Sequence, residues 1–337
     1  MLSQLPLLRL RFCLRVTEAA ALPPYKGDLL RFALLWHLGS LWCREPERCR
    51  DGCRQPGECL FGRLIEPLAD STWSEPLRRL MGSTPPPAYT LWDCQDRRTQ
   101  VLPGDRFSFE LTLIGETAIR QLPAFLAAFM ICGERGIGRE RLRGQLERVE
   151  ALSGPDGQVR ELLVDGAWQG GPVEEMAIGY ADGLHWAIPP IFPPASGRDR
   201  GGVTRFCLRF LSPVEVKVKG QVARTPEFPA LARAAVRRLR ILSEVHGVGE
   251  WSHAGYGPLL DLADGVRLEH HETTWLCLPR HSQRGGWMAT EGFVGQAWYV
   301  AEGDVRPLLA ALWLGQWLGV GKGATWGGGR YEVQVVE

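Results

Sequence analysis

A glycine-rich segment near the end of the chain, residues 314–331, has the composition of a phosphate-binding loop. Its glycines alternate with two cations, a threonine and an indole in the sequence LGQWLGVGKGATWGGGRY. Glycine permits positive φ angles and close approach of the backbone to a ligand, so successive N–H groups can surround a phosphate. The segment lacks the GxxxxGK[ST] pattern of a P-loop and follows a predicted helix instead of preceding one. It predicts contacts with a nucleic-acid backbone, whereas the alternative is a simple mobile turn; the candidate residues are Gly321, Lys322, Gly323, Trp326 and Arg330.

Four cysteines form a second group with possible ligand chemistry, in the pattern C-x5-C-x3-C-x5-C: Cys43, Cys49, Cys53 and Cys59. Four thiolates this close together can complete a tetrahedral Zn²⁺ site. The intervening residues are too polar to bury four free thiols in a core, and exposed thiols are open to oxidation. The pattern predicts a structural Zn²⁺ that holds this loop together, with free cysteines and an iron–sulfur cluster as the alternatives.

The composition is that of two ordinary domains with one basic region. The chain has 337 residues and a formal net charge of +1. The charge is uneven, because the segment between positions 203 and 240 contains nine Lys/Arg and only two acidic residues. This region predicts either a phosphate-binding face or a solvated surface. The N-terminal apolar run contains arginines, no stretch approaches the roughly 18 apolar residues of a spanning helix, and the cysteine count is odd. These features predict a protein of the reducing cytoplasm without a membrane segment.

Two strands of nearly identical sequence, Arg11–Val16 and Arg205–Phe210, indicate a duplicated architecture. In both strands Phe and Leu alternate with Arg and Cys, as expected when one face is buried. The further elements predicted for the first half are a helix at 28–42, a strand at 107–114, a helix at 117–132, a glycine turn at 133–138 and a strand at 159–164. Those predicted for the second half are a helix at 225–245 with Thr225 as N-cap, a loop at 245–258, strands at 265–277 and 292–300, a helix at 304–318 and a strand at 331–336.

Each half therefore reads β-α-β-β-α-β, which predicts an α+β fold of two tandem ferredoxin-like, RRM-like domains. The first domain is predicted to cover residues 1–190, with the cysteine-rich insertion at 43–59 after its first helix. A Pro/Gly-rich linker at 191–202 leads to the second domain, residues 203–337. The open face of such a sheet is the surface that the RRM uses for RNA.

Four motifs occur in order along the chain: LPPYKGDLLR at 22–31, LFGRLIEP at 60–67, FLSPVEVK at 210–217 and GFVGQ at 292–296. Together with the C-terminal glycine loop, this ordered set resembles the CRISPR precursor-RNA processing endoribonucleases of the RAMP superfamily. The resemblance implies a protein that binds a CRISPR repeat and cuts it without a metal. In this chemistry the ribose 2′-OH attacks the adjacent phosphate and leaves a 2′,3′-cyclic phosphate and a 5′-OH, so no cofactor is expected for catalysis.

The resemblance also implies which residues act. The reaction needs a base, an acid and a cation, and histidine suits the first two roles because its pKa lies near the working pH. The family places its catalytic histidine on the first helix, which here is His37. Tyr25 and Lys26, at the start of that helix, are expected to position the phosphate and to stabilise its charge. The alternative for His37 is a core histidine in an apolar helix, with His246 and His253 as the reserve candidates.

Cations on the second half complete the predicted RNA interface: Arg205, Arg209, Lys217, Lys219, Arg280 and Arg284, besides Lys322 and Arg330. Such contacts are expected to be salt-dependent and mostly independent of base identity. The sequence thus predicts an endoribonuclease with CRISPR repeat or guide RNA as partner. The main alternative is a non-catalytic RAMP subunit that holds guide RNA together with other subunits of a CRISPR effector complex, and a third is a protein-interaction subunit that carries a zinc loop.

Overall fold

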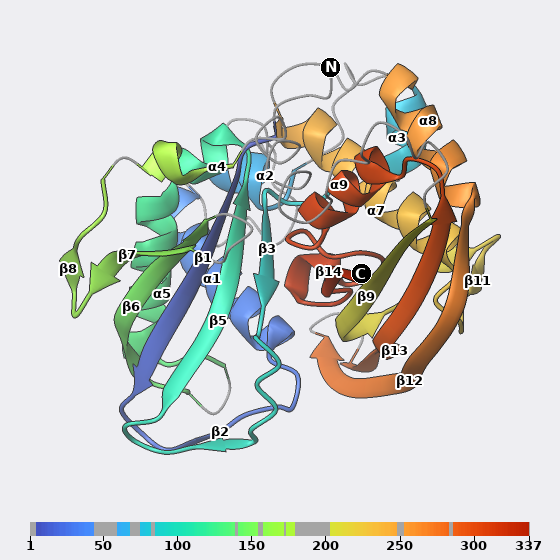
Figure 1. The fold of residues 1–337 in the computed structure, drawn as a ribbon. Helices are drawn as coiled ribbons and strands as arrows, with labels where there is room; N and C mark the ends of the chain where they lie inside the picture. The colour runs from blue at the N-terminus through green and yellow to red at the C-terminus, as the bar shows by residue number, and fades with distance from the viewer. Residues whose placement is uncertain are drawn as a thin grey trace. The chain divides into compact units, whose positions relative to one another are not determined.

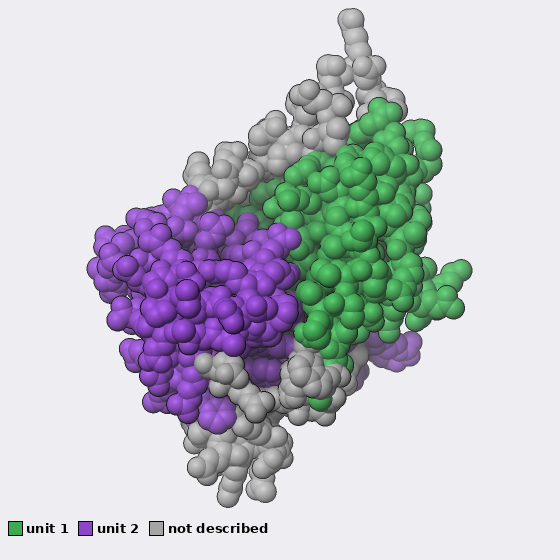
Figure 2. Space-filling model, turned by 90° about the horizontal axis from the view of Figure 1, so that it is seen from below, with its two compact units in different colours: residues 1–5, 178–244, 248–337 green, residues 6–177, 245–247 purple. Residues whose placement is uncertain are grey.

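The chain, drawn in Figure 1, forms two compact units, which Figure 2 colours separately. This computed structural model describes residues 5–43, 59–67, 75–81, 85–138, 141–153, 158–171, 173–178, 203–247, 253–282 and 286–336. The N-terminal unit comprises residues 6–177 and 245–247, and the C-terminal unit comprises residues 1–5, 178–244 and 248–337. The predicted linker at 191–202 lies outside the described residues. None of the helices described here is long and apolar enough to cross a bilayer.

The N-terminal unit is built on an antiparallel sheet with β1 (Leu7–Val16) at its centre. The strand order is β3-β5-β1-β6-β7-β8. The remaining strands are β3 (Tyr89–Trp92), β5 (Arg106–Ile114), β6 (Gly144–Ser153), β7 (Gln158–Val164) and β8 (Ala167–Trp168), and a separate pair joins β2 (Ala20–Ala21) to β4 (Gln100–Val101). Phe12 and Leu14 of β1 are buried, whereas Arg11 and Arg15 lie on the opposite face. The alternation in the sequence therefore predicted both faces of the strand.

Helices α1 (Gly27–Trp42) and α5 (Leu122–Arg135) cover the apolar face of this sheet (Figure 1). Phe12, Phe109 and Phe129 meet between the two layers with ring centroids 4.6–5.2 Å apart, a separation at which aromatic rings attract one another. Shorter helices complete the unit: α2 (Leu60–Leu64), α3 (Glu75–Met81), α4 (Glu116–Arg120) and the 3₁₀ turn η2 (Val173–Met176). The single helix predicted at 117–132 is divided at Gln121, because Pro123 occupies the first turn of α5.

The C-terminal unit contains a four-stranded antiparallel sheet in the order β12-β13-β9-β14. Its strands are β9 (Val203–Val214), β12 (Val266–Ser282), β13 (Gly286–Glu302) and β14 (Tyr331–Val336), and the short strands β10 (Lys217–Val218) and β11 (Gln221–Val222) form a separate hairpin. The helices are α7 (Phe228–His246), α8 (His253–Asp264), α9 (Arg306–Gly315) and the 3₁₀ turn η3 (Ala324–Trp326). Phe206 of β9 packs on Phe228 and Tyr299, which places the sheet's apolar face against α7.

Both sheets have the ferredoxin-like strand order, in which the first strand lies between the third and the fourth. In the N-terminal unit these strands are β3, β5, β1 and β6, and in the C-terminal unit they are β12, β13, β9 and β14. Each unit also places two helices in the positions that the β-α-β-β-α-β order requires. The predicted fold class, two tandem ferredoxin-like domains, is confirmed.

Two predicted boundaries in the C-terminal unit were wrong. Helix α7 begins at Phe228 and not after Thr225, because the carbonyl of Pro226 accepts a hydrogen bond from the Tyr299 hydroxyl at 2.7 Å instead of joining the helix. Part of the loop predicted at 245–258 belongs to helix α8. Its glycines and Pro258 suggested a turn, but Leu259 and Ala263, four residues apart, bury one face of the helix.

Acid is expected to destabilise the N-terminal unit through His246. The Nε2–H of this residue donates to the carbonyl oxygen of Pro86 at 2.8 Å, and burial lowers its pKa from 6.5 to about 4. Below pH 6.5 the unfolded chain binds a proton that the folded chain excludes, so stability is lost as the pH falls from 6.5 towards 4. The loss should reach about 3 kcal/mol. Urea unfolding between pH 4 and 7.5 measures it, and a His246→Gln variant should show a flatter pH dependence.

Candidate functional site

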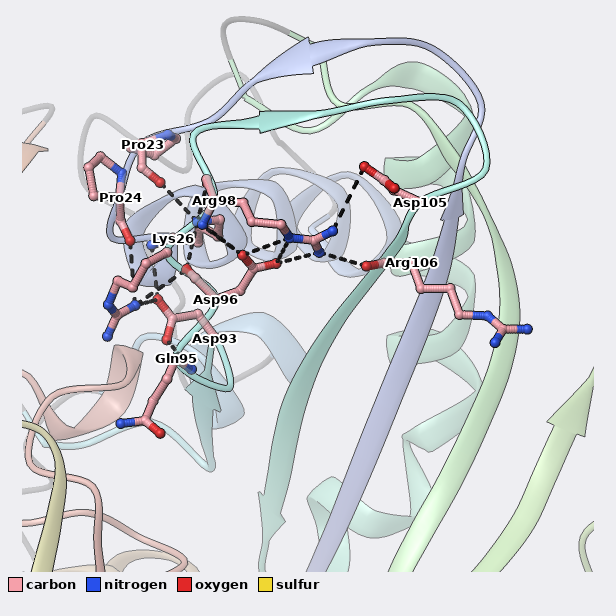
Figure 3. Close-up of polar contacts among 10 residues, drawn as sticks. Pro23, Pro24, Lys26, Asp93, Gln95, Asp96, Arg98, Asp105 and Arg106 are labelled. Carbon is pink, nitrogen blue, oxygen red and sulfur yellow. Dashed lines mark hydrogen bonds and ion pairs between the residues drawn. The ribbon is translucent and has the colours of Figure 1, made fainter.

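The loop that leads into α1 is organised around the buried ammonium group of Lys26 (Figure 3). This side chain is 0% exposed. Its Nζ donates to the carbonyl oxygens of Pro23 at 3.1 Å, Asp96 at 2.6 Å and Arg98 at 2.9 Å. Burial lowers the pKa of Lys26, and the nearby Asp96 carboxylate, at 3.8 Å, opposes that effect. Three donors therefore meet three carbonyl acceptors, and Lys26 ties the start of α1 to the loop at 93–98.

This geometry does not support the phosphate-positioning roles predicted for Tyr25 and Lys26. Tyr25 is 2% exposed, and the ammonium hydrogens of Lys26 are bonded to backbone oxygens. The sequence motif at 22–31 had suggested a cation next to the first helix, which is correct. The side chain turns inward because the carbonyl groups of two loops converge on it, and this arrangement depends on residues about 70 positions away.

Replacing Lys26 with methionine is expected to destabilise the N-terminal unit by about 3 kcal/mol or more. The substitution keeps the length of the side chain but leaves three carbonyl oxygens without their donor. Thermal and urea unfolding measure the loss, and Lys217→Met, at an exposed lysine of β10, is the matched control. A Lys26→Met protein of unchanged stability that fails to cleave RNA would instead support the catalytic role.

His37 lies on α1 and is 8% exposed. Burial lowers the pKa of His37 below 6.5, and the positive charge of Arg135 lowers it further. The imidazole is therefore neutral at pH 7. A neutral imidazole can accept a proton from a hydroxyl, which is the protonation state that a general base needs.

Arg135 comes close to His37 because α1 and α5 pack side by side in opposite directions. Trp42, at the end of α1, meets Phe125 near the start of α5 with ring centroids 5.6 Å apart. Leu29, near the start of α1, lies directly against Gly138, just beyond the end of α5, and leaves no room for a Cβ there. Arg135 is the last residue of α5, is exposed, and is followed by Gly136 with φ of 92°.

No function of Arg135 was evident from the sequence. The signal that could have found it is the glycine turn at 133–138, because this turn ends the second helix of a β-α-β-β-α-β unit. In that topology the two helices lie on the same face of the sheet, so the end of the second helix lies beside the first.

The glycine loop of the C-terminal unit packs against the end of β9. Gly319, Gly321, Gly323, Gly327 and Gly329 have φ between 65° and 96°. A Cβ at Gly321 would overlap the carbonyl oxygen of Glu215, and one at Gly329 would overlap that of Val320. Several loop N–H groups donate within the protein: those of Lys322 to Glu215 at 3.0 Å and of Gly329 to Pro213 at 2.8 Å are examples. These glycines are needed for close packing of one backbone segment on another.

The predicted ligands in this loop differ in accessibility. The Nζ of Lys322 donates to Glu215 at 2.8 Å, and its side chain is 53% exposed. Trp326 is half-buried, and Arg330 is 6% exposed, with its backbone N–H donating to Ser212 Oγ. Lys322 is therefore the member of the set that is best placed for a ligand in solvent.

The remaining predicted RNA contacts are distributed over the sheet and hairpins of the C-terminal unit. Arg205 and Arg209 are exposed on β9 and form ion pairs with Glu269 at 3.4 Å and Glu332 at 3.9 Å. Exposed ion pairs are weak, so a phosphate can compete for both arginines. Lys217 and Lys219 are exposed on and beside β10, and Arg280 lies on β12 rather than in a loop.

Beside this set, His270 of β12 stacks on Trp298 of β13, with ring centroids 4.2 Å apart. His271 is also exposed, with its Nδ1 at 2.8 Å from the Thr273 hydroxyl. Arg284 and two of the four predicted zinc ligands, Cys49 and Cys53, lie outside the described residues. Cys43 and Cys59 are half-buried, and the described part of the chain contains no group of three or more metal-ligating side chains.

Two family models match the chain in tandem. Residues 5–172 match a family described as an N-terminal domain, and residues 208–331 match the CRISPR-associated endoribonuclease Cas6. Among curated proteins, no sequence matches the chain significantly.

Solved structures share the fold of the whole chain. A partial Cas6-RT-Cas1–Cas2 complex contains a chain that matches with a TM-score of 0.61 and 14% identity, over 99% of this chain and 47% of that one. A Cas6 product complex from Thermus thermophilus matches with a TM-score of 0.54 and 15% identity, over 97% and 99% of the two chains. This chain therefore spans about half of the first of these relatives, and 29% of the chain in a second Cas6-RT-Cas1–Cas2 complex.

Two ferredoxin-like units in tandem, the second ending in a glycine-rich loop and a final strand, are the fold that this chain shares with the solved Cas6 structures. Residues 208–331 match the Cas6 family model, and the predicted resemblance to CRISPR RNA-processing endoribonucleases is confirmed.

Proposed function

We propose that this protein binds CRISPR repeat RNA and cleaves precursor transcripts into guide RNAs without a metal ion. The Cas6 domain at residues 208–331 is the observation that carries the proposal. The position of His37 supports it, because a neutral imidazole on the first helix can transfer protons at neutral pH. Exposed cations of the C-terminal unit, among them Arg205, Arg209 and Lys322, supply candidate contacts for the RNA backbone.

In the proposed reaction His37 accepts the proton of the ribose 2′-OH. The 2′-oxygen then forms a bond to the adjacent phosphorus, and the bond from phosphorus to the 5′-oxygen breaks. The imidazolium returns its proton to that 5′-oxygen, so the products are a 2′,3′-cyclic phosphate and a 5′-OH, with His37 neutral again. No redox change and no added reactant are needed.

The test is incubation of the purified protein with repeat RNA from its own CRISPR locus in the presence of EDTA. A single cut that leaves a cyclic phosphate is the expected result, and mapping of the 3′ end identifies it. The matched control is the same RNA with a 2′-deoxyribose at the scissile nucleotide, which should bind but stay intact. Cleavage of that control RNA, or cleavage abolished by EDTA, would contradict the proposed chemistry.

A non-catalytic RNA-binding subunit is the second candidate, and the burial of His37 favours it. With 8% of its surface exposed, His37 must become accessible to a 2′-OH before it can act. Tight binding of the repeat by a protein that leaves the unmodified RNA intact would establish this alternative.

Partners and cofactors extend the same proposal. The solved Cas6-RT-Cas1–Cas2 complexes suggest that guide RNA made here passes to other subunits of a CRISPR complex. We also propose a cytoplasmic location and a structural Zn²⁺ held by Cys43, Cys49, Cys53 and Cys59, with no role in cleavage. Metal analysis of the purified protein before and after a chelator tests the zinc site.

A further inference from the structure

We infer that Arg135 is a catalytic residue of the proposed ribonuclease, and that its guanidinium group binds the scissile phosphate beside His37. This inference rests on the proposed function. It assigns to Arg135 the cationic role that the sequence had suggested for Lys26.

The packing of α1 against α5 sets the position of Arg135 relative to His37. The contact between Trp42 and Phe125 fixes the level at which the two antiparallel helices meet. From that contact, the start of α1 and the end of α5 extend in the same direction. At a rise of 1.5 Å per residue, the Cα of Arg135 lies about 7.5 Å further from the contact, measured along the helix axes, than the Cα of His37. An extended arginine side chain spans a comparable length. The contact of Leu29 with Gly138 holds the other end of the two helices in place. The position of α5 along α1 is therefore fixed at both ends.

The guanidinium group of Arg135 is accessible to a ligand. Arg135 is exposed, and its guanidinium has neither an ion pair nor a hydrogen bond with any residue in the described ranges. Lys26, the cation that the sequence suggested for this role, has its donors bonded to three carbonyl oxygens. Arg120, on the neighbouring helix α4, is paired with Glu116. Arg135 therefore retains its donors for a ligand.

Arg135 also acts on His37 through its positive charge. Arg135 is the charged residue that acts on His37 among the described residues, and it disfavours a second positive charge there. A phosphate between the two side chains would reverse this effect, because its negative charge balances the guanidinium and favours the imidazolium. Proton uptake by His37 would then be promoted when substrate is bound.

The chemistry of the guanidinium suits this role. Arginine stays protonated at all working pH values and can donate two parallel hydrogen bonds to the nonbridging oxygens of a phosphate. As the 2′-oxygen bonds to phosphorus and the 5′-oxygen departs, negative charge accumulates on those nonbridging oxygens. A donor placed at such charge before the reaction lowers the barrier, and removal of one typically costs 10²–10³-fold in rate.

The test compares Arg135→Ala, Arg135→Lys and the control Arg120→Ala in single-turnover cleavage of repeat RNA, with unfolding measured for each. We expect Arg135→Ala to cleave about 100-fold more slowly, Arg135→Lys to recover part of the rate, and Arg120→Ala to match the wild type. Binding of the 2′-deoxy control RNA should change much less than the rate. In the free protein, NMR titration of His37 should show a higher pKa in Arg135→Ala, because a nearby positive charge is gone.

The outcomes separate this inference from the proposed function. If the wild type cleaves and Arg135→Ala cleaves at the same rate, the inference fails and the ribonuclease stands. If Arg135→Ala loses rate only in proportion to lost stability or lost RNA binding, Arg135 is structural or a general RNA contact and the inference also fails. If the wild type leaves the RNA intact, the proposed function fails and the assignment of Arg135 fails with it.

Discussion

A His37→Ala variant is expected to cleave repeat RNA about 10³-fold more slowly than the wild type, while binding it with nearly unchanged affinity. General acid–base catalysis by a positioned side chain contributes 10²–10⁴-fold, and in the proposed reaction His37 both accepts and returns the proton. Binding should persist because the candidate phosphate contacts lie on other residues, Arg205, Arg209 and Lys322 among them. Single-turnover cleavage and binding of the 2′-deoxy RNA measure the two quantities separately.

The matched control is His270→Ala, which removes an exposed histidine of β12. This variant should cleave at the wild-type rate, apart from any effect of the lost stacking on Trp298. The pH profile gives an independent check. Because burial and Arg135 lower the pKa of His37 in the free protein, the cleavage rate at subsaturating RNA, which reports the free protein, should hold below pH 6.5 and fall only when His37 becomes protonated. Full activity in His37→Ala would make His37 a core residue.

A Gly329→Ala variant is expected to destabilise the C-terminal unit by about 4 kcal/mol or more, enough to prevent folding of many proteins. Gly329 has φ of 65°, and an added Cβ would overlap the backbone carbonyl of Val320. That carbonyl belongs to the same loop, and Val320 also donates to the oxygen of Gly329 at 2.8 Å, so neither segment can move without breaking the other's hydrogen bonds. The expected measurements are a lower midpoint of urea unfolding and a reduced yield of folded protein.

Gly303→Ala separates strain of the backbone from steric overlap. Gly303 lies in the same unit with φ of 83°, but nothing lies within 4 Å of the added Cβ. Only the cost of a positive φ applies there, about 1 kcal/mol. Similar losses in the two variants would show that the overlap at Gly329 is relieved by movement of the loop, and that the glycine loop is less rigid than its contacts indicate.

The strands were predictable because their pattern is local. Phe12 and Leu14 alternate with Arg11 and Arg15, and burial of one face of a strand follows from that alternation alone. The repeated sequence at Phe206 then placed a second strand of the same kind at the centre of the second sheet. The ends of helices were less predictable. The start of α7, for example, depends on a hydrogen bond that the Tyr299 hydroxyl, on a strand 73 residues away, donates to the carbonyl oxygen of Pro226.

The sequence by itself determined the duplicated ferredoxin-like fold, the resemblance to CRISPR RNA-processing proteins and the candidate histidine. Only the tertiary structure decided where the cations lie. Lys26 is buried because carbonyl groups from two loops converge on it, and Arg135 lies beside His37 because two helices almost 100 residues apart pack in opposite directions. Likewise, the glycines near Lys322 allow the loop to pack on β9, and this packing could not be predicted from their spacing in the sequence. Residue type and periodicity are properties of the local sequence, whereas the contacts of a charged side chain depend on neighbours that folding brings together.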